Sequence, residues 1–278
     1  MPRWTIDQPT TLDFDHVSTV RVRAIAGTVA VLSTDKRPCL DIAKIAGKPL
    51  RVSHEDGVLT VSYDDLTWDG LLGWLRPQRH SATITITVPR DCAAQVGVVS
   101  AAAIVSGIGA DTAVKSVSGD VTLDGVTGTV DVTTVSGDVE AQGLDGEIGF
   151  NSVSGDLTLA SGAVRQLNAR AVSGRVTADI DIEPGADLRI ATVSGAVAVR
   201  LPAHADARLD LRSTTGRVQG EFEGLYSSRL PGAHTLTGDI GTGAGKLSVA
   251  TTSGEITLLR RGAGAAHREP ADATGEPR

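Results

Sequence analysis

Hydrophobic and polar residues alternate along much of this chain, and the alternating pattern repeats every nine residues. In each repeat unit the first, fifth and seventh positions are apolar and the third is usually glycine. Alternation with a period of two is typical of β-strands with one buried side, so we expect the four apolar or glycine positions to face inward. The clearest consecutive units begin at Val117, Val126, Val135, Leu144 and Val153.

Glycine recurs at the third position of the units, most visibly in the four letters VSGD. This tetrapeptide occurs at residues 117–120, 135–138 and 153–156, and the variants VSGR, VSGA, TTGR and TSGE follow downstream. A narrow coil has the least room on its inward side, so we expect these glycines to serve the backbone. They are Gly119, Gly128, Gly137, Gly146, Gly155, Gly174, Gly195, Gly216 and Gly254.

The repeat length predicts how the strands are arranged in space. Two nine-residue strands make one coil, and successive coils of a solenoid stack about 4.8 Å apart. Downstream, extra residues enter only before alternate units, which a stack of equal coils tolerates at one corner. The pattern predicts an all-β fold, a β-solenoid of 18–21-residue coils around a narrow core. An antiparallel β-sandwich is the structural alternative.

The regularity of the repeat divides the chain into three parts. Residues 97–260 carry the regular solenoid pattern, and residues 1–96 carry a less regular alternation that we expect to continue the same fold. An apolar insert interrupts the first part at residues 66–80. Residues 261–278 are small, charged and contain proline, which predicts a disordered tail.

Composition narrows the possible functions. The net charge of −7 and the pI near 5.4 argue against a nucleic-acid partner, because no basic stripe is available to neutralise phosphates. Cys39 and Cys92 lie far apart without metal-ligand spacing, so we expect two reduced thiols, with a disulfide as the alternative. The N-terminus lacks an apolar leader and no stretch is long enough to span a bilayer, which favours a cytoplasmic location.

Three aspartates of the VSGD units are the weak candidates for a metal site. Asp120, Asp138 and Asp156 would form an outward column in which each neighbouring pair repels by about 1 kcal/mol in water. A cation would relieve this repulsion. The next member of the column is Arg175, however, and the glycine-rich calcium nonapeptide is absent. We therefore expect a solvated structural column, with no metal and no cofactor.

The sequence contains no recognisable catalytic motif. The six histidines are scattered, and neither a nucleophile elbow nor a complete phosphate-binding loop is present. Polysaccharide-cleaving β-helix enzymes need clustered carboxylates and usually aromatic platforms. Aromatic residues make up only 3% of this chain. We predict that the protein is not an enzyme, and a polysaccharide-active enzyme is the less favoured alternative.

One segment, DLTWDGLLGWLRPQRH at residues 65–80, breaks the strand rhythm and is rich in tryptophan and leucine. Helical spacing would bring several of its apolar side chains to one face. Three interpretations stay open: a lid over the solenoid, a contact site for a partner or a second copy, and weak docking on the inner face of a membrane. The candidate contact residues are Trp68, Leu71, Leu72, Trp74 and Leu75.

Several stretches together resemble a known bacterial family. They are the recurring VSGDV, the intervening GVTGTVDV, the opening RVRAIAGTVAV, a strand closing in ITVP, and a final TTSGEITL. In combination they resemble the "putative adhesin" domain of unknown function, a β-strand-repeat family that includes LiaG-like proteins. The resemblance covers roughly residues 20–259. It implies a β-solenoid or β-helix-like fold and an association with the cell envelope, and it implies no catalytic residues.

We therefore expect a non-enzymatic β-strand-repeat protein that serves as an adhesin-like interaction module. Its partner would be a protein or a cell-envelope component. A self-assembling scaffold, in which copies of the chain form a homo-oligomer, is the first alternative.

Overall fold

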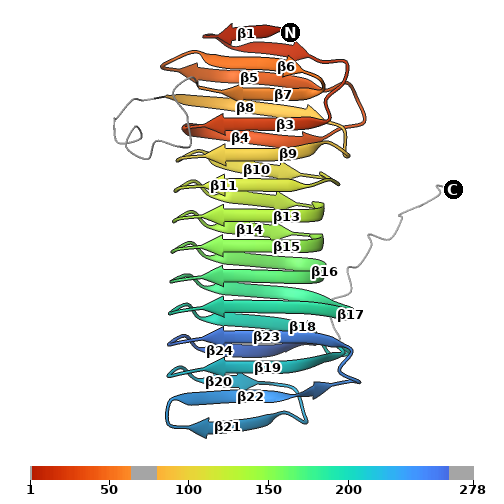
Figure 1. The fold of residues 1–278 in the computed structure, drawn as a ribbon, viewed down its shortest axis with the longest axis vertical. Helices are drawn as coiled ribbons and strands as arrows, with labels where there is room; N and C mark the ends of the chain where they lie inside the picture. The colour runs from red at the N-terminus through yellow and green to blue at the C-terminus, as the bar shows by residue number, and fades with distance from the viewer. Residues whose placement is uncertain (1, 64–79, 263–278) are drawn as a thin grey trace, which may run out of the picture.

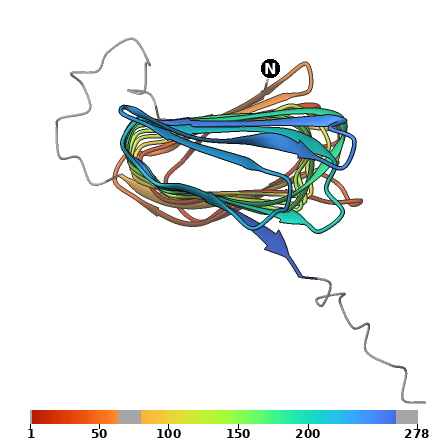
Figure 2. The ribbon, with the colours of Figure 1, turned by 90° about the horizontal axis from the view of Figure 1, so that it is seen from below.

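The computed structural model describes residues 2–63 and 80–262, and every regular element in these ranges is a β-strand. The strands stack into one elongated column (Figure 1). Seen along the stack, they form two faces that enclose a narrow interior (Figure 2). The all-β, solenoid-like fold predicted from the repeat is confirmed. None of the described residues belongs to a helix long and apolar enough to cross a membrane.

The first face contains twelve strands, two of which, β16 and β17, bend around a corner and continue into the second face. In spatial order the first face consists of β2 (Thr10–Asp13), β5 (Cys39–Ala46), β8 (Ser81–Val88), β4 (Ala26–Ser33), β10 (Ala102–Ser106), β12 (Val121–Asp124), β14 (Val139–Gln142), β16 (Leu157–Ala171), β17 (Val176–Thr192), β18 (Val197–Pro202), β24 (Ile256–Arg261) and β20 (Val218–Gly220).

The second face lies opposite the first across the core. In spatial order it consists of β1 (Arg3–Ile6), β6 (Leu50–Glu55), β7 (Val58–Ser62), β3 (Thr19–Ala24), β9 (Ala93–Val98), β11 (Thr112–Ser116), β13 (Thr127–Thr134), β15 (Asp145–Ser152), the later parts of β16 and β17, β23 (Gly245–Thr251), β19 (Ala207–Ser213), β22 (Ala233–Ile240) and β21 (Tyr226–Leu230).

Strands in the middle of the stack are parallel and stay in the register of the repeat. Val121 of β12 pairs with Val139 of β14, which pairs with Leu157 of β16, so each residue meets its equivalent one coil away. The inward positions are small or aliphatic and almost fully buried along the whole column. The narrow core follows from this composition, because no large ring has to be accommodated at most levels.

The two corners that join the faces differ in length. At what we call the VSGD corner, four residues connect the strands in each of seven coils: 117–120, 135–138, 153–156, 172–175, 193–196, 214–217 and 252–255. At the opposite corner the connections have two residues at 125–126 and 143–144, four at 89–92 and 203–206, and five at 107–111. β16 and β17 pass through the opposite corner as continuous strands.

The coils do not follow the order of the sequence at either end, which corrects the simple stack that we expected. The last coil in sequence, β23 and β24, lies between the β17–β18 coil and the β19–β20 coil. Likewise, the β3–β4 coil lies between β7–β8 and β9–β10. The extra residues near 221–240, interpreted as a corner insertion, instead form an antiparallel hairpin of β21 and β22. Alternation alone cannot reveal this order, because any coil with an open edge can accept the next.

Antiparallel strands close both faces at the N-terminal end of the stack and the second face at the C-terminal end. β5 and β6 run antiparallel to β8 and β7 at the N-terminal end, and β1 and β2 pair antiparallel with β6 and β5. At the C-terminal end β22 runs antiparallel to β19. At these three edges the end strands break the parallel repeat that a further coil would otherwise continue, whereas β20 at the end of the first face stays parallel to β24.

Candidate functional site

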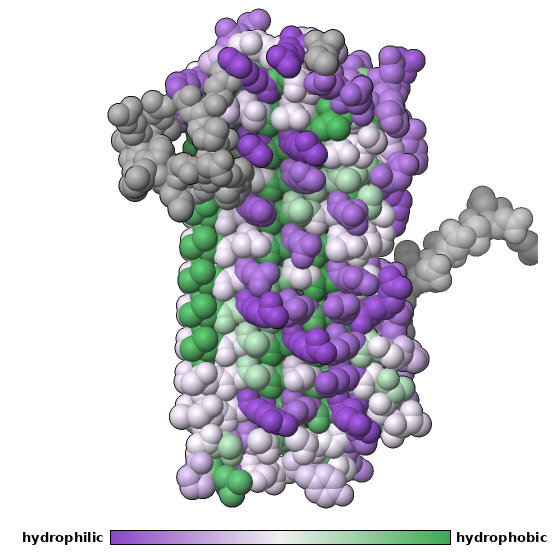
Figure 3. All heavy atoms as spheres, viewed as in Figure 1, coloured by the Kyte–Doolittle hydropathy of each residue, from purple (hydrophilic) through white to green (hydrophobic). Residues whose placement is uncertain are grey.

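The first residue of each VSGD unit points outward, which corrects the template in which this position faced the core. We call Val117, Val135, Val153, Val172 and Val193 the valine column. The last four have 46–50% of their surface exposed. Figure 3 shows apolar side chains aligned along the edge of the molecule where this corner lies. The alternation is interrupted because these four residues turn from one face to the other.

The serine of each unit hydrogen-bonds along the stack. The hydroxyl of Ser136 donates to the carbonyl oxygen of Val117 at 3.1 Å, and Ser154 donates to Val135 at the same distance. Each serine therefore bonds the backbone of the preceding coil. These bonds pin the outward turn of one coil onto the next.

The glycine of each VSGD unit lies against the backbone of the neighbouring coil. A Cβ atom on Gly137 would lie much closer than 3.0 Å to the carbonyl oxygen of Gly119, and the same holds between Gly155 and Gly137. The column continues through Gly174, Gly195, Gly254 and Gly216, in the corrected order of the coils. Only glycine permits this approach of two backbones.

The other two expected structural glycines lie near the opposite corner, in β13 and β15. A Cβ atom on Gly146 would lie closer than 3.0 Å to the carbonyl oxygen of Gly128, whereas a Cβ atom on Gly128 would have no such close neighbour. Gly128 and Gly146 have φ angles of 97° and 124°, a region that favours glycine. Gly128 is exposed rather than inward-facing.

Each aspartate of the VSGD units accepts a backbone hydrogen bond from the following coil. The amide of Asp138 donates to Oδ1 of Asp120 at 3.1 Å, and the amide of Asp156 donates to Oδ1 of Asp138 at 2.9 Å. The amide of Arg175 completes the series on Asp156 at 2.7 Å. Among the described residues, no group of three or more His, Cys, Asp or Glu side chains is placed to hold a metal ion. The column therefore has a structural use that the sequence analysis did not identify.

A second set of hydroxyl groups, also missed from the sequence, closes the VSGD corner from inside. Thr134 is buried, and its Oγ1 accepts a hydrogen bond from the amide of Gly137 at 3.0 Å and donates to the carbonyl oxygen of the same residue at 3.1 Å. The only sequence signal is a serine or threonine directly before six of the seven units, the exception being Ala171. The buried members are Ser116, Thr134, Ser152, Thr192, Ser213 and Thr251.

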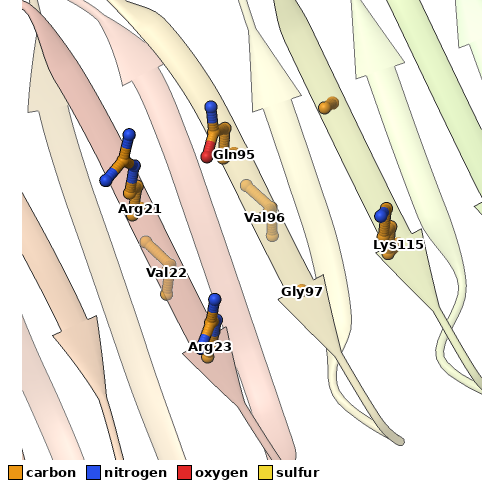
Figure 4. A pocket seen from close by; sticks show the side chains of 8 residues that line it. Arg21, Val22, Arg23, Gln95, Val96, Gly97 and Lys115 are labelled. Carbon is orange, nitrogen blue, oxygen red and sulfur yellow. The ribbon is translucent and has the colours of Figure 1, made fainter. Parts of the chain in front are cut away.

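A shallow basic groove lies on the second face, near the N-terminal end of the stack. Its volume is about 510 Å³, and Figure 4 shows Arg21 and Arg23 of β3, Gln95 of β9 and Lys115 of β11 standing on the same outer side. Gly97 lies between Arg23 and Lys115 in the strand register and leaves the floor open. None of the described residues that line the groove is a carboxylate, so they provide no acid–base pair.

The cysteines are free thiols in the structure. Burial, followed by the nearby charge of Asp91, raises the pKa of Cys92 to about 11, against a smaller opposing effect of a backbone hydrogen bond. Burial likewise raises the pKa of Cys39, as do its hydrogen bond to Asp13 and nearby negative charge. Both thiols are therefore protonated at neutral pH and poorly suited to nucleophilic chemistry.

The predicted contact residues of the apolar insert (Trp68, Leu71, Leu72, Trp74 and Leu75) lie outside the described residues, as do residues 263–278 of the predicted tail. Residues 64–79 come between β7 of the second face and β8 of the first, in the same place along the chain as the VSGD corner of later coils. Tyr63 and His80, the described residues on either side of this range, stack with their ring centroids 5.4 Å apart.

Comparisons with known proteins give one family match and several distant structural likenesses. No curated protein matches the chain. A "putative adhesin" from Bacteroides fragilis is 13% identical, with a TM-score of 0.39 over 91% of this chain and 97% of that one. A "putative lipid binding protein" from Parabacteroides distasonis is also 13% identical, with a TM-score of 0.39 over 92% and 97% of the two chains. A "putative adhesin" from Parabacteroides merdae is 12% identical, with a TM-score of 0.35 over 92% and 96%.

These structural likenesses are too distant to carry an argument. The family comparison is more decisive, because the model described as Toastrack DUF4097 matches residues 42–259, most of the chain. This match confirms the resemblance of the repeated motifs to a domain of unknown function. The chain therefore belongs to the Toastrack DUF4097 family.

Proposed function

We propose that this protein is a non-catalytic, adhesin-like interaction module that binds its partner along the VSGD corner. The observation that supports this most is the valine column, in which four consecutive coils each expose about half of a branched apolar side chain. The turn itself does not require valine, because Thr252 and Thr214 occupy the same position in two other coils. The fold therefore leaves these side chains available for a partner.

The geometry of the column favours an extended partner surface. Coils repeat about 4.8 Å apart, so the valines form a straight ridge one side chain wide. Aligned apolar side chains on a folded surface are a common mark of contact sites. Asp120, Asp138 and Asp156 follow the ridge on its first-face side and add negative charge. A protein or cell-envelope component with a long apolar groove and basic residues along one rim would fit this ridge.

The polar groups nearest the ridge support a binding role rather than catalysis. One oxygen of each aspartate accepts a backbone hydrogen bond, and each serine donates to a carbonyl oxygen of the previous coil. These groups are committed to holding the coils together. A general acid or nucleophile would need a perturbed pKa and an accessible reacting atom.

The proposal is tested by removing the apolar character of the ridge without changing its shape. In the triple variant Val135→Thr, Val153→Thr and Val172→Thr, the new residue is one that this corner already contains. We expect at least about tenfold weaker co-sedimentation with isolated bacterial envelopes, because three apolar contacts are lost. The matched control changes three exposed residues of the first face, Thr122→Ser, Glu140→Gln and Thr158→Ser, and should bind like the wild type.

Equal binding by the triple variant and the wild type would contradict a role for the VSGD corner. The polysaccharide-active alternative has its own test, a screen of envelope and plant polysaccharides. Turnover that disappears on replacing a single carboxylate would overturn the non-catalytic part of the proposal.

A further inference from the structure

The strand β21 ends the second face at the C-terminal end of the stack. It pairs with β22 on one side, and no described strand pairs with its other side (Figure 1). All five residues of β21 are exposed. Tyr226 and Leu230 have 78% and 62% of their surface exposed, more than any member of the valine column. An exposed edge strand of this kind is a template for pairing with another strand.

The register of the hairpin shows which side chains of β21 share a face. Ser227 pairs with Leu236, whose side chain is buried, so Ser227 and Arg229 point to the inner side. Tyr226, Ser228 and Leu230 alternate with them and point outward. The outward side of β21 therefore presents an aromatic residue, a small hydroxyl and an aliphatic residue in a row.

We propose that β21 is a self-association site, where a second copy of this chain adds its own β21 antiparallel across a two-fold axis at Ser228. Tyr226 then faces the partner's Leu230, and Ser228 faces the partner's Ser228. Aromatic–aliphatic and hydroxyl pairs are favourable cross-strand neighbours. The two-fold axis makes each contact twice, as in other isologous interfaces. The proposal does not depend on the role of the valine column.

The register centred on Ser228 is selected by the sequence of the strand itself. It is the only antiparallel self-pairing that aligns all five residues of one copy with all five of the other. It also sets Arg229 opposite the partner's Ser227. A shift that places Arg229 opposite the partner's Arg229 would bring like charges together, which disfavours it. A second copy is thus a self-complementary occupant of this edge.

The other end strands are less suited to pairing. β1 and β2 have four residues each, and β20 has three. Short edge strands are a common way of preventing strand addition. The asymmetry between the two ends predicts a closed dimer through β21 rather than an open filament.

One strand junction is small compared with the roughly 1,600 Å² that a stable interface buries. We therefore expect a weak dimer that forms as the protein concentration rises. Sedimentation velocity over a wide concentration range should show the full-length wild-type chain passing from monomer to dimer.

Introducing a positive or a negative charge at Ser228 distinguishes this arrangement from other dimers. In Ser228→Lys or Ser228→Glu, equal charges face each other across the axis, and we expect the dissociation constant of each to rise about tenfold or more. An equimolar mixture of the two variants should dimerise again, because lysine then faces glutamate. Thr133→Lys is the matched control, since it adds the same charge to an exposed position of β13.

Three results would overturn the proposal: a wild type that stays monomeric at all concentrations, a Ser228→Lys variant that dimerises like the wild type, or a mixture that stays monomeric. Unchanged thermal unfolding of the single variants would show that the hairpin is intact. The rescue by mixing tests the contact even where one variant is less stable.

Discussion

Two corners connect the two faces of this solenoid, and they differ in how constant the length of the connection is. Every VSGD corner from residue 117 onward has four residues, and its hydroxyls, carboxylates and amides bond from coil to coil. The opposite corner uses two, four or five residues, or none where a strand continues through it. From residue 117 onward, therefore, the length of the connection varies only at the opposite corner.

The glycines show the physical cause of this difference. At the VSGD corner Gly137 packs against the backbone of the preceding coil, and an added Cβ would overlap it. At the opposite corner nothing lies within 4 Å of the position that a Cβ on Gly125 or Gly185 would occupy. Close backbone packing therefore recurs in all seven of these VSGD corners, whereas at the opposite corner it occurs at some glycines, such as Gly146 against Gly128, and not at others.

The largest expected difference between the corners comes from replacing one glycine at each corner with alanine. Gly137→Ala should lower the free energy of unfolding by about 3 kcal/mol or more, because two backbones must move apart. Gly125→Ala should cost only about 1 kcal/mol, since its cost is the left-handed φ of 59° rather than a clash. Denaturant unfolding measures both. Equal losses would refute the distinction between a packed and an open corner.

The buried hydroxyl that precedes each VSGD unit gives the next effect. Thr134→Val leaves the amide and carbonyl of Gly137 without their side-chain partner, so we expect a loss of about 1–3 kcal/mol. Thr133→Val, at the exposed neighbouring position of the same strand, should stay within about 0.5 kcal/mol of the wild type. A Thr134→Val protein as stable as this control would show that the inner hydroxyl is dispensable.

A third comparison replaces valine with threonine at the first position of two repeat units, one at each corner. Val126 at the opposite corner is fully buried, and Val126→Thr should cost about 1–3 kcal/mol because it buries a hydroxyl. Val153 at the VSGD corner is 49% exposed, and Val153→Thr should change stability by less than about 0.5 kcal/mol. Thermal unfolding of the two variants gives the answer, and a costly Val153→Thr would mean that the valine column is needed by the fold.

The smallest effect concerns acid sensitivity at the opposite corner. Hydrogen bonds from the amide of Ala244 and from Thr242 lower the pKa of Asp206 below its ordinary value of 3.8. The stability that Asp206 adds is complete above pH 3.8 and is lost as the pH falls through its lowered pKa. The difference in unfolding midpoint between wild type and Asp206→Ala should therefore be constant near neutrality and shrink below pH 3.8. A difference that does not change with pH would contradict this role.

Much of the fold was predictable because its contacts are periodic. Equivalent residues such as Val121 and Val139 pair one coil apart, so the nine-residue spacing predicted both the strands and their register. The candidate site was less predictable. Val135 is the same residue type as the buried valines of the core, and only the turn of the backbone reveals that it faces outward. The burial of Thr134 was not predicted, because a polar residue before a turn gives no indication that it is buried.

The sequence by itself determined that this chain is an all-β solenoid, because alternation and period are local properties that each coil repeats. Only the tertiary structure decided the order of the coils at the two ends, the exposed valine column and the free edge at β21. These features depend on which strand edges meet in space. An open parallel edge accepts any coil with a matching face, so the placement of β23 and β24 between earlier coils follows from the hairpin of β21 and β22 that closes the end.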